Sequence, residues 1–381
     1  MHTHSPAYNF RRGARLWAAL GIALTLLTAG CAKSPTVPAA PVFSPAPVSM
    51  ESPETFVHNL RPEGQELQTW QDLAPTLRKS LRYVNAKDPQ GVAIQRPGLR
   101  LTWGEMAHTL RTLQILLPLL DAQPELFLQR FRWVPVEEGI KYSGYYEPQI
   151  AASRTPKPGY HPIYRRPPDL AAHRAKGRLY HSRKAIDGRG VLKGKGLELA
   201  WAKDIVDVFF LQIQGSGRLV FDDGTTAFIN YDGQNGHKYK SSGRIMAAKG
   251  LLREGHIYEQ RQWFKDNPHR VWEILQDNPS YVFFRFGTRG PTGAMGHVVD
   301  GWMSLATSRA FIPLGSIVAF GVNIPDQEKG QLPLRGIGFA QDVGGAIKKN
   351  RIDIFCGGDE RANYVASHLD NSGPAWVLVA K

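Results

Sequence analysis

The chain has 381 residues and a formal net charge of +14 at pH 7, from 47 Lys and Arg against 33 Asp and Glu. A surface this basic indicates a polyanionic partner. The chain contains only two cysteines, Cys31 and Cys356, which excludes a fold held together by several disulfide bonds.

Residues 1–30 have the pattern of a secretory signal peptide. An arginine-containing start without acidic residues precedes an apolar stretch from Leu16 to Gly30, shorter than the roughly 20 residues that span a bilayer. Small residues then lead into Cys31, which resembles the bacterial lipobox, where the cysteine is acylated and becomes the new N-terminus. The alternative is an ordinary signal peptide that happens to contain Cys31. If Cys31 carries lipid, Cys356 has no disulfide partner.

Residues 31–54 are predicted to form a lipidated tether, because six prolines among small residues favour extended chain and cannot build a core. Removal of the signal peptide takes away three Arg and lowers the net charge to +11. Export argues against nucleic acid as the polyanion and favours peptidoglycan, whose stem peptides carry free carboxylates. The remaining body of about 330 residues is large enough for two hydrophobic cores.

The first part of the body, residues 57–142, is predicted to be helical. Leucines four residues apart from Leu73 to Leu81 mark one helix. A second helix begins at a capping box from Thr102 to Glu105. It continues with apolar residues at helical spacing, namely Met106, Leu110, Leu113, Leu117 and Leu120. We expect these side chains to pack in the core.

Strands and turns are predicted from Tyr142 onward. Residues 150–200 are basic and rich in Pro and Gly, and residues 206–214 are predicted to form a strand. Helical stretches are expected at about 241–252 and 259–266. Later strands are expected at residues 317–320, 336–340, 351–355 and 376–380. The pattern indicates two β-rich lobes with helices attached to one of them.

Most common catalytic signatures are missing from the sequence. It contains no G-x-S-x-G elbow, no P-loop and no complete G-x-G-x-x-G, and its histidines lack metal-ligand spacing. Serine-nucleophile and metal-dependent chemistry are therefore disfavoured, and no metal or cofactor is expected.

The segment from Gln341 to Phe355 is the most informative part of the sequence for catalysis. Asp342 closes an apolar strand, and the last five residues alternate so that Asp353 lies opposite two isoleucines. If the isoleucines face the core, Asp353 points outward beside an aromatic ring, and its pKa should rise, as a general acid near neutral pH requires. The alternative is a surface carboxylate paired with Arg351.

This segment resembles the terminal motif of the membrane-bound lytic transglycosylase A family (MltA), and the likeness covers about residues 55–381. It rests on an ordered set of segments, namely Ser143 to Pro148, Phe209 to Gly217, Asn235 to His237, Ser242 to Arg244, Asn278 to Phe284, Gly290 to Ala294 and Gln341 to Phe355. The ordered set is far more specific than any single segment.

The resemblance implies a mainly β, α+β fold of two lobes with a groove between them for the glycan. A double-psi β-barrel lobe with N-terminal helices would comprise residues 55–144 and 288–381. A second, β-rich substrate lobe, residues 145–287, would be inserted into it. The helix and strand pattern agrees with this arrangement but does not by itself identify a barrel.

The resemblance also implies a reaction, in which Asp353 is the single catalytic acid and base and Asp342 is the family's second acidic position. One carboxyl is sufficient for a lytic transglycosylase, which leaves 1,6-anhydro-N-acetylmuramic acid ends and consumes no water. An ordinary glycosidase needs two carboxyls. Asp342 is therefore either a supporting residue that orders the following glycine turn or a second catalytic carboxylate. A two-carboxylate muramidase and a non-catalytic peptidoglycan-binding lipoprotein are the competing functions.

Four further residues are candidates for contact with glycan strands. Gln212 and Gln214 alternate with apolar residues and would face one side of the expected strand, whereas only one of Tyr145 and Tyr146 could face the groove. Core or interlobe packing is the alternative role for the tyrosines. Ala32 after the modified cysteine, instead of an aspartate, predicts a lipid anchor on the periplasmic face of the outer membrane. Other cell-wall enzymes are expected as partners.

Overall fold

The computed structural model describes residues 51–137, 139–253, 255–348 and 350–381. The signal peptide, Cys31 and most of the tether lie outside these ranges. Pro53 and Glu54, which the sequence assigned to the tether, belong to helix α1 (Pro53–His58), and the Ser52 side chain caps it. Within the described ranges, no helix has the length and hydropathy needed to cross a bilayer.

The first part of the body is less helical than expected. Several helices pack with the eight-stranded sheet that is described below. They are α1, η1 (Pro62–Gln65), η2 (Trp70–Leu73), α2 (Ala74–Asn85), α3 (Trp103–Leu116), η3 (Leu117–Leu119), α4 (Leu126–Arg130) and α10 (Glu360–His368). Between α2 and α3 lies a hairpin of β1 (Val92–Arg96) and β2 (Leu99–Thr102) that the helical prediction missed. Its Pro97-Gly98 turn, with Gly98 at φ 72°, is the local signal for that hairpin.

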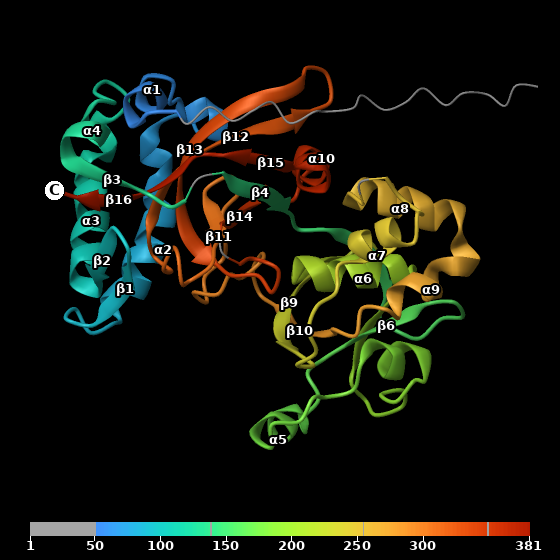
Figure 1. Ribbon diagram of the computed structural model, residues 1–381. Coiled ribbons are helices and arrows are strands. Elements are labelled where there is room, and N and C mark those ends of the chain that lie inside the picture. The colour runs from blue at the N-terminus through green and yellow to red at the C-terminus, as the bar shows by residue number, and fades with distance from the viewer. Residues whose placement is uncertain (1–50, 138, 254, 349) are drawn as a thin grey trace, which may run out of the picture. The chain divides into compact units, whose positions relative to one another are not determined.

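The predicted capping box is confirmed at the start of α3, where the side chains of Thr102 and Glu105 each accept from the other residue's backbone N–H. Such a box satisfies two backbone donors that the first helical turn leaves free. The apolar face of α3 is buried, with Leu110 and Leu113 at most 1% exposed. This face packs beside β16 (Ala375–Ala380), as Figure 1 shows.

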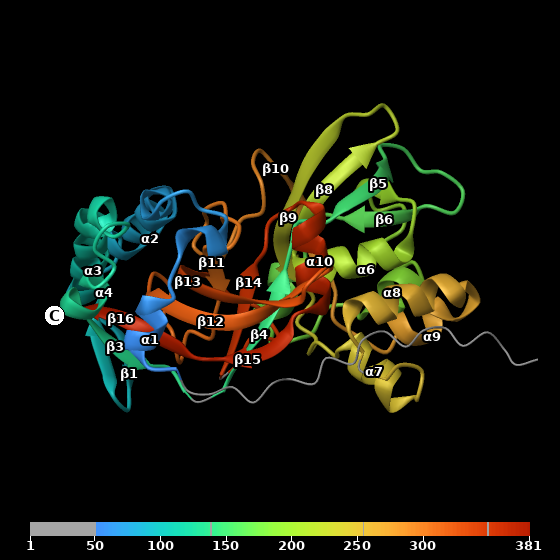
Figure 2. The same cartoon turned by 90° about the horizontal axis from the view of Figure 1, so that it is seen from above.

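An eight-stranded sheet forms the core of this part of the molecule. In sheet order its strands are β15 (Asp370–Gly373), β4 (Ile140–Tyr145), β14 (Arg351–Phe355), β11 (Ser304–Ala306), β13 (Gly330–Asp342), β12 (Ile317–Asp326), β16 and β3 (Phe131–Pro135). The four strands expected near the C-terminus are therefore confirmed. Helix α10 lies against β4 (Figure 2).

Between β4 and β11 the chain forms a second, six-stranded sheet, and we call this region the insert. In sheet order its strands are β10 (Val282–Gly287), β9 (Thr226–Gln234), β8 (Ser216–Phe221), β5 (Gln149–Ser153), β7 (Glu198–Ala202) and β6 (His161–Tyr164). A single bridge between Arg165 and Phe284 brings the chain after β6 to the opposite edge strand. The helices of the insert are α5 (Leu170–Ala175), η4 (Lys184–Gly188), α6 (Ile205–Gln214), α7 (Ser242–Ala248), α8 (Ile257–Asp266), η5 (Pro268–Arg270) and α9 (Val271–Leu275).

The strand predicted at residues 206–214 is wrong, because these residues form helix α6. The Asp204 side chain accepts from the N–H of Val206 at 2.8 Å at its start, and Gly215, at φ 81°, ends it in the left-handed region. Most of the residues of α6 are buried. Gln212 and Gln214 alternate with apolar residues as they would in a strand, and this local period of two led to the wrong prediction.

Candidate active site

The strand register brings Asp342 and Asp353 to the same face of the eight-stranded sheet. Ala306, on the central strand β11, is the partner of Asp342 on β13 and of Asp353 on β14. Residues paired across neighbouring strands point to the same side, so both carboxyls flank the small Ala306 side chain. On the next strand, Ser143 of β4 pairs with Asp353 and lies on this face as well.

Asp342 is held by three donors. Its Oδ1 accepts from the backbone N–H groups of Ala294 at 2.9 Å and Val343 at 2.8 Å, and its Oδ2 accepts from the Tyr145 hydroxyl at 3.1 Å. Burial nevertheless raises the pKa of Asp342 to about 6, against these hydrogen bonds and with a smaller contribution from the charge of Asp353. Asp342 therefore fixes two loops and a tyrosine in place.

Asp353 has a different environment. Its Oδ1 is buried and has no hydrogen-bond partner among the described residues. Burial raises the pKa of Asp353, while the Ser143 hydroxyl and the charge of Arg351 oppose the shift. Arg351 donates instead to Ser143 Oγ, at 3.0 and 2.7 Å, and makes no ion pair with Asp353 in the described structure. The surface ion pair considered from the sequence is not formed.

An apolar cluster surrounds the two carboxyls. Tyr145, Val299, Ala306, Ile347 and Phe355 pack together, and the rings of Tyr145 and Phe355 are 5.1 Å apart. The expected aromatic neighbour of Asp353 is thus present on its own strand. Because Tyr145 is only 9% exposed and donates to Asp342, it positions that carboxyl and is poorly placed to stack on a sugar.

The other predicted glycan contacts are dispersed. Gln212 is buried, and its Oε1 accepts from Arg183 Nη2 at 2.6 Å. Gln214 Oε1 accepts from the backbone N–H of Tyr146 at 3.1 Å, and the Tyr146 side chain is buried in the main core. The expectation that both glutamines face one side is wrong, because residues two apart on a helix point about 200° away from each other.

Glu147 and Arg218 were not identified as site residues from the sequence. Glu147, directly after β4, bonds Gly357 through its backbone, and its Oε2 accepts from Arg218 Nη2 at 3.0 Å. Glu147 Oε1 and Arg218 Nε are buried without a partner in the described part of the chain. The sequence did contain a signal, since Glu147 belongs to the Ser143–Pro148 segment that carried the resemblance.

A hydrogen bond joins strand β9 of the insert to the loop that binds Asp342. Asn230 of β9 donates to Thr292 Oγ1 at 3.3 Å, two residues before the Ala294 N–H that binds Asp342.

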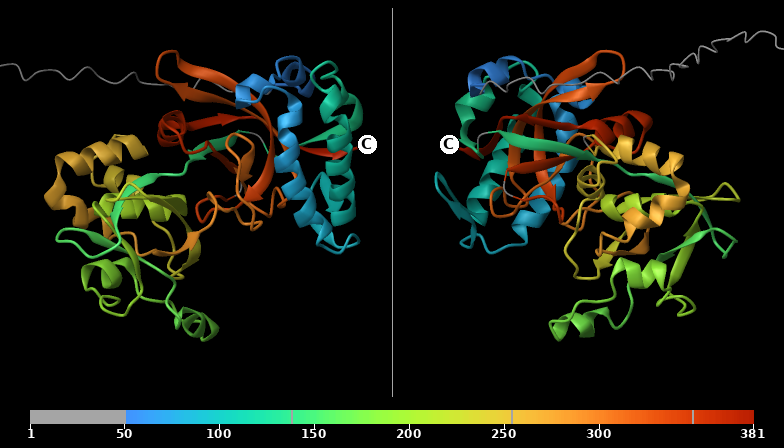
Figure 3. Two further views of the ribbon diagram at one scale, coloured as in Figure 1. Left: turned by 180° about the vertical axis from the view of Figure 1, so that it is seen from behind. Right: turned by 45° about the vertical axis from the view of Figure 1, so that its right-hand side comes forward.

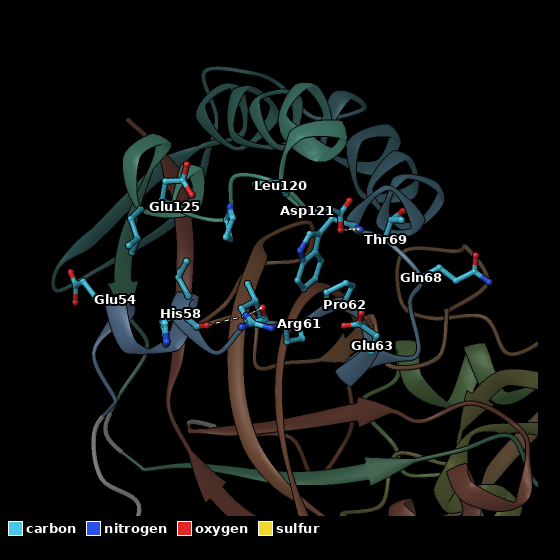
Figure 4. Close-up of a pocket in the computed structure, with 15 residues that line it drawn as sticks. Glu54, His58, Arg61, Pro62, Glu63, Gln68, Thr69, Leu120, Asp121 and Glu125 are labelled. Carbon is cyan, nitrogen blue, oxygen red and sulfur yellow. Dashed lines mark hydrogen bonds between the residues drawn. The ribbon is translucent and has the colours of Figure 1, made fainter.

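The described residues contain no group of three His, Cys, Asp or Glu that could hold a metal. A pocket of about 700 Å³ lies elsewhere, lined by residues between Glu54 and Leu128, and includes neither carboxyl (Figure 4).

Two family models match the chain, the MltA specific insert domain over residues 141–285 and the 3D domain over residues 303–379. Membrane-bound lytic murein transglycosylase A of Escherichia coli K12 is 34% identical over 248 residues, which is 63% of this chain and 65% of that protein. The homologue of Vibrio cholerae is 29% identical over the same length. The sequence match thus spans slightly less than two thirds of these relatives.

Solved structures match over more of the chain. A membrane-bound lytic murein transglycosylase from Agrobacterium tumefaciens has a TM-score of 0.70 and 28% identity, covering 85% of this chain and 96% of that one. E. coli MltA with bound chitohexaose has a TM-score of 0.65 and 27% identity, covering 80% and 89%. Both family models match in order and these solved structures share the fold, so the chain is similar to membrane-bound lytic murein transglycosylase A along most of its length.

Proposed function

We propose that this chain is a peptidoglycan lytic transglycosylase in which Asp353 is the only catalytic acid and base. The observation that carries the proposal is the contrast between the two carboxyls. Burial raises the pKa of both, but Asp342 has both oxygens engaged by three donors, whereas Asp353 has a buried oxygen without a partner in the described structure. A protonated carboxyl with a free oxygen is what proton donation to a leaving group requires.

In the proposed reaction, Asp353 protonates the oxygen between N-acetylmuramic acid and N-acetylglucosamine. The resulting carboxylate then takes the proton of the muramyl 6-hydroxyl, which attacks the anomeric carbon and closes a 1,6-anhydro ring. The sugar ring holds this hydroxyl at high effective concentration, so no water or second carboxylate is needed. Asp342 acts by holding the loops at Ala294 and Val343 and the Tyr145 ring.

The proposed fold is a double-psi β-barrel lobe of residues 55–144 and 288–381, with residues 145–287 inserted and the glycan in a groove between the lobes. Contacts of β12 with β15 and with Pro374, directly after β15, support a barrel-like curvature of the eight-stranded sheet. Asn371 donates to the Asn323 carbonyl at 2.6 Å, and the Gly321 N–H donates to the Pro374 carbonyl at 3.0 Å. Chitohexaose bound to E. coli MltA supports a glycan ligand.

Among the predicted glycan contacts, Gln214 is the best supported. It is half-buried, and its amide nitrogen has no partner in the described structure, although its oxygen binds the Tyr146 backbone. We assign Gln212 to the core of the insert because Arg183 occupies its oxygen. Tyr145 and Tyr146 support the site by positioning Asp342 and by packing in the core, respectively.

The products of murein digestion test the reaction. Fragments should end in 1,6-anhydro-N-acetylmuramic acid, one water lighter than a muramidase product, and chelator should leave the rate unchanged. The raised pKa of Asp342, about 6, favours a two-carboxylate muramidase as the second candidate. Reducing ends that carry heavy oxygen from labelled water, detected by mass spectrometry, would establish that alternative. Murein that is bound but uncut would indicate a binding lipoprotein.

We also propose that Cys31 is acylated and anchors the chain to the periplasmic face of the outer membrane. The run of small residues into Cys31 and the membrane-bound relatives support this. Cys31→Ala should release the protein into the soluble periplasmic fraction, as followed by fractionation and immunoblotting. Cys356→Ala is the matched control, since Cys356 is buried and should not affect anchoring. Equal membrane recovery of all three proteins would rule out the anchor.

A further inference from the structure

One part of the insert carries most of the chain's excess positive charge. Residues 154–203 contain 13 Lys and Arg but only three Asp and Glu. Six exposed cations of this segment form no ion pair or side-chain hydrogen bond within the described ranges, and we name them the cationic patch: Lys176, Arg178, Lys184, Arg189, Lys193 and Lys195. They lie between the end of α5 and Lys195, in the segment that includes η4. Helix α5 itself projects from the rest of the insert (Figures 1 and 3).

The three acidic residues of the segment are all engaged by internal groups. Asp187 contacts Arg183 at 3.4 Å and accepts from the Tyr281 hydroxyl at 3.0 Å, in the core of the insert. Asp169 accepts from the Tyr180 hydroxyl at 3.0 Å, and Glu198 from the backbone N–H of Gly194 at 3.3 Å. None of them forms an ion pair with a residue of the cationic patch within the described ranges.

The loop from Lys184 to Leu197 is held in place by buried apolar residues and by backbone hydrogen bonds. Leu192 and Leu197 are buried in an apolar cluster, while Lys193 and Lys195 between them are exposed. Backbone hydrogen bonds from Lys193 to Gly190 at 2.9 Å and from Arg189 to Lys184 at 3.1 Å close its turns. The cations are thus held on a folded surface, so that binding a ligand orders only their side chains and little entropy is lost.

His181 shows that these charges lie close together. Burial lowers the pKa of His181, the charges of Lys195, His173 and Arg189 lower it further, and the charge of Asp169 opposes the shift. The ring of Tyr180 lies 5.1 Å from that of His173 and 4.8 Å from that of His181, which joins α5 to the loop. Arg189 and Lys195 of the loop and His173 of α5 therefore all act on the same His181 ring.

We infer that the cationic patch binds the free carboxylates of peptidoglycan stem peptides and thereby holds the protein on the murein network. Charge complementarity selects a polyanion. Apart from Leu179, the surface offers little exposed apolar area for insertion into lipid, which favours a charged polymer over a membrane. The inference rests on the proposed function only for the identity of the polymer, and it leaves the chemistry at Asp353 unchanged.

Sedimentation with isolated sacculi tests the patch. The full-length triple variant Arg189→Gln, Lys193→Gln, Lys195→Gln is compared with a control of equal charge change outside the insert. The control is Arg100→Gln, Arg130→Gln, Arg132→Gln, whose side chains are exposed. Binding is measured at low temperature, before cleavage. We expect the patch variant to bind sacculi about tenfold more weakly at low salt, as three exposed ion pairs would contribute. The difference should vanish at high salt.

Two further substrates separate the possible outcomes. On glycan strands stripped of peptides, both variants should bind and cleave like wild type. Equal binding of sacculi by the patch variant and the control would overturn the inference. So would a patch variant that keeps its affinity for sacculi but loses affinity for phosphatidylglycerol vesicles, since the ligand would then be lipid. If wild type yields no anhydro product from either substrate, the proposed function fails, while the sedimentation result still decides the role of the patch.

Discussion

Asp353→Asn is expected to lower the rate of murein cleavage by about 10²–10⁴-fold, the usual contribution of a positioned acid and base. Asparagine keeps the shape of the side chain but cannot donate a proton in the same way. Because burial disfavours the charged form of Asp353, its removal should leave the thermal midpoint unchanged or slightly higher. The rate is measured by release of soluble muropeptides, and the midpoint by calorimetry.

Asp370→Asn provides a matched control on the same sheet face. Asp370 pairs with Ser143 across β15 and β4, as Asp353 does across β14 and β4, but it is exposed and forms an ion pair with Lys141 at 2.9 Å. Such a pair contributes little to stability. Asp370→Asn should therefore retain activity close to wild type. Near-normal cleavage by Asp353→Asn, in a sample whose Asp370→Asn control is also active, would refute the assignment of Asp353.

The stability difference between wild type and Asp342→Asn is expected to depend strongly on pH. The folded chain raises the pKa of Asp342 from 3.8 to about 6, so between these values the folded state binds more protons than the unfolded state. The contribution of Asp342 to the free energy of unfolding is therefore most favourable at low pH and falls as pH rises through this window. The asparagine of the variant does not titrate, so wild type should lose about 2 kcal/mol relative to the variant between pH 4 and pH 7.

Denaturant unfolding of both proteins at several pH values from 4 to 7 provides the measurement. Asp187 also has a pKa raised to about 6 by burial, but it is present in both proteins, so its contribution cancels in the difference. A difference that stays constant over this range would mean that the three hydrogen bonds to Asp342 offset its burial completely. A difference that changes in the opposite direction would show that the hydrogen bonds outweigh burial.

Local signals in the sequence were sufficient to predict much of the secondary structure. The capping box at Thr102 placed the start of α3, and alternation of side chains placed β14 with its isoleucines toward the core. Both signals act over a few residues, where the backbone geometry dictates which side chains share a face. Local signals failed for α6, because Gln212 and Gln214 alternate with apolar residues as they would in a strand, although the residues form a helix.

The resemblance to the family and the Asp342–Asp353 segment likewise came from the sequence alone. Their relation in space did not, because it depends on β11, a strand of only three residues that separates β13 from β14. Pairing through Ala306 places the two carboxyls on one face, and packing of the Tyr145 hydroxyl against Asp342 leaves Asp353 as the carboxyl with a free oxygen. The sequence by itself thus determined the residue types and the local alternation. Only the tertiary structure distinguished the environments of the two carboxyls, because hydrogen-bond partners and burial come from residues far apart in the chain.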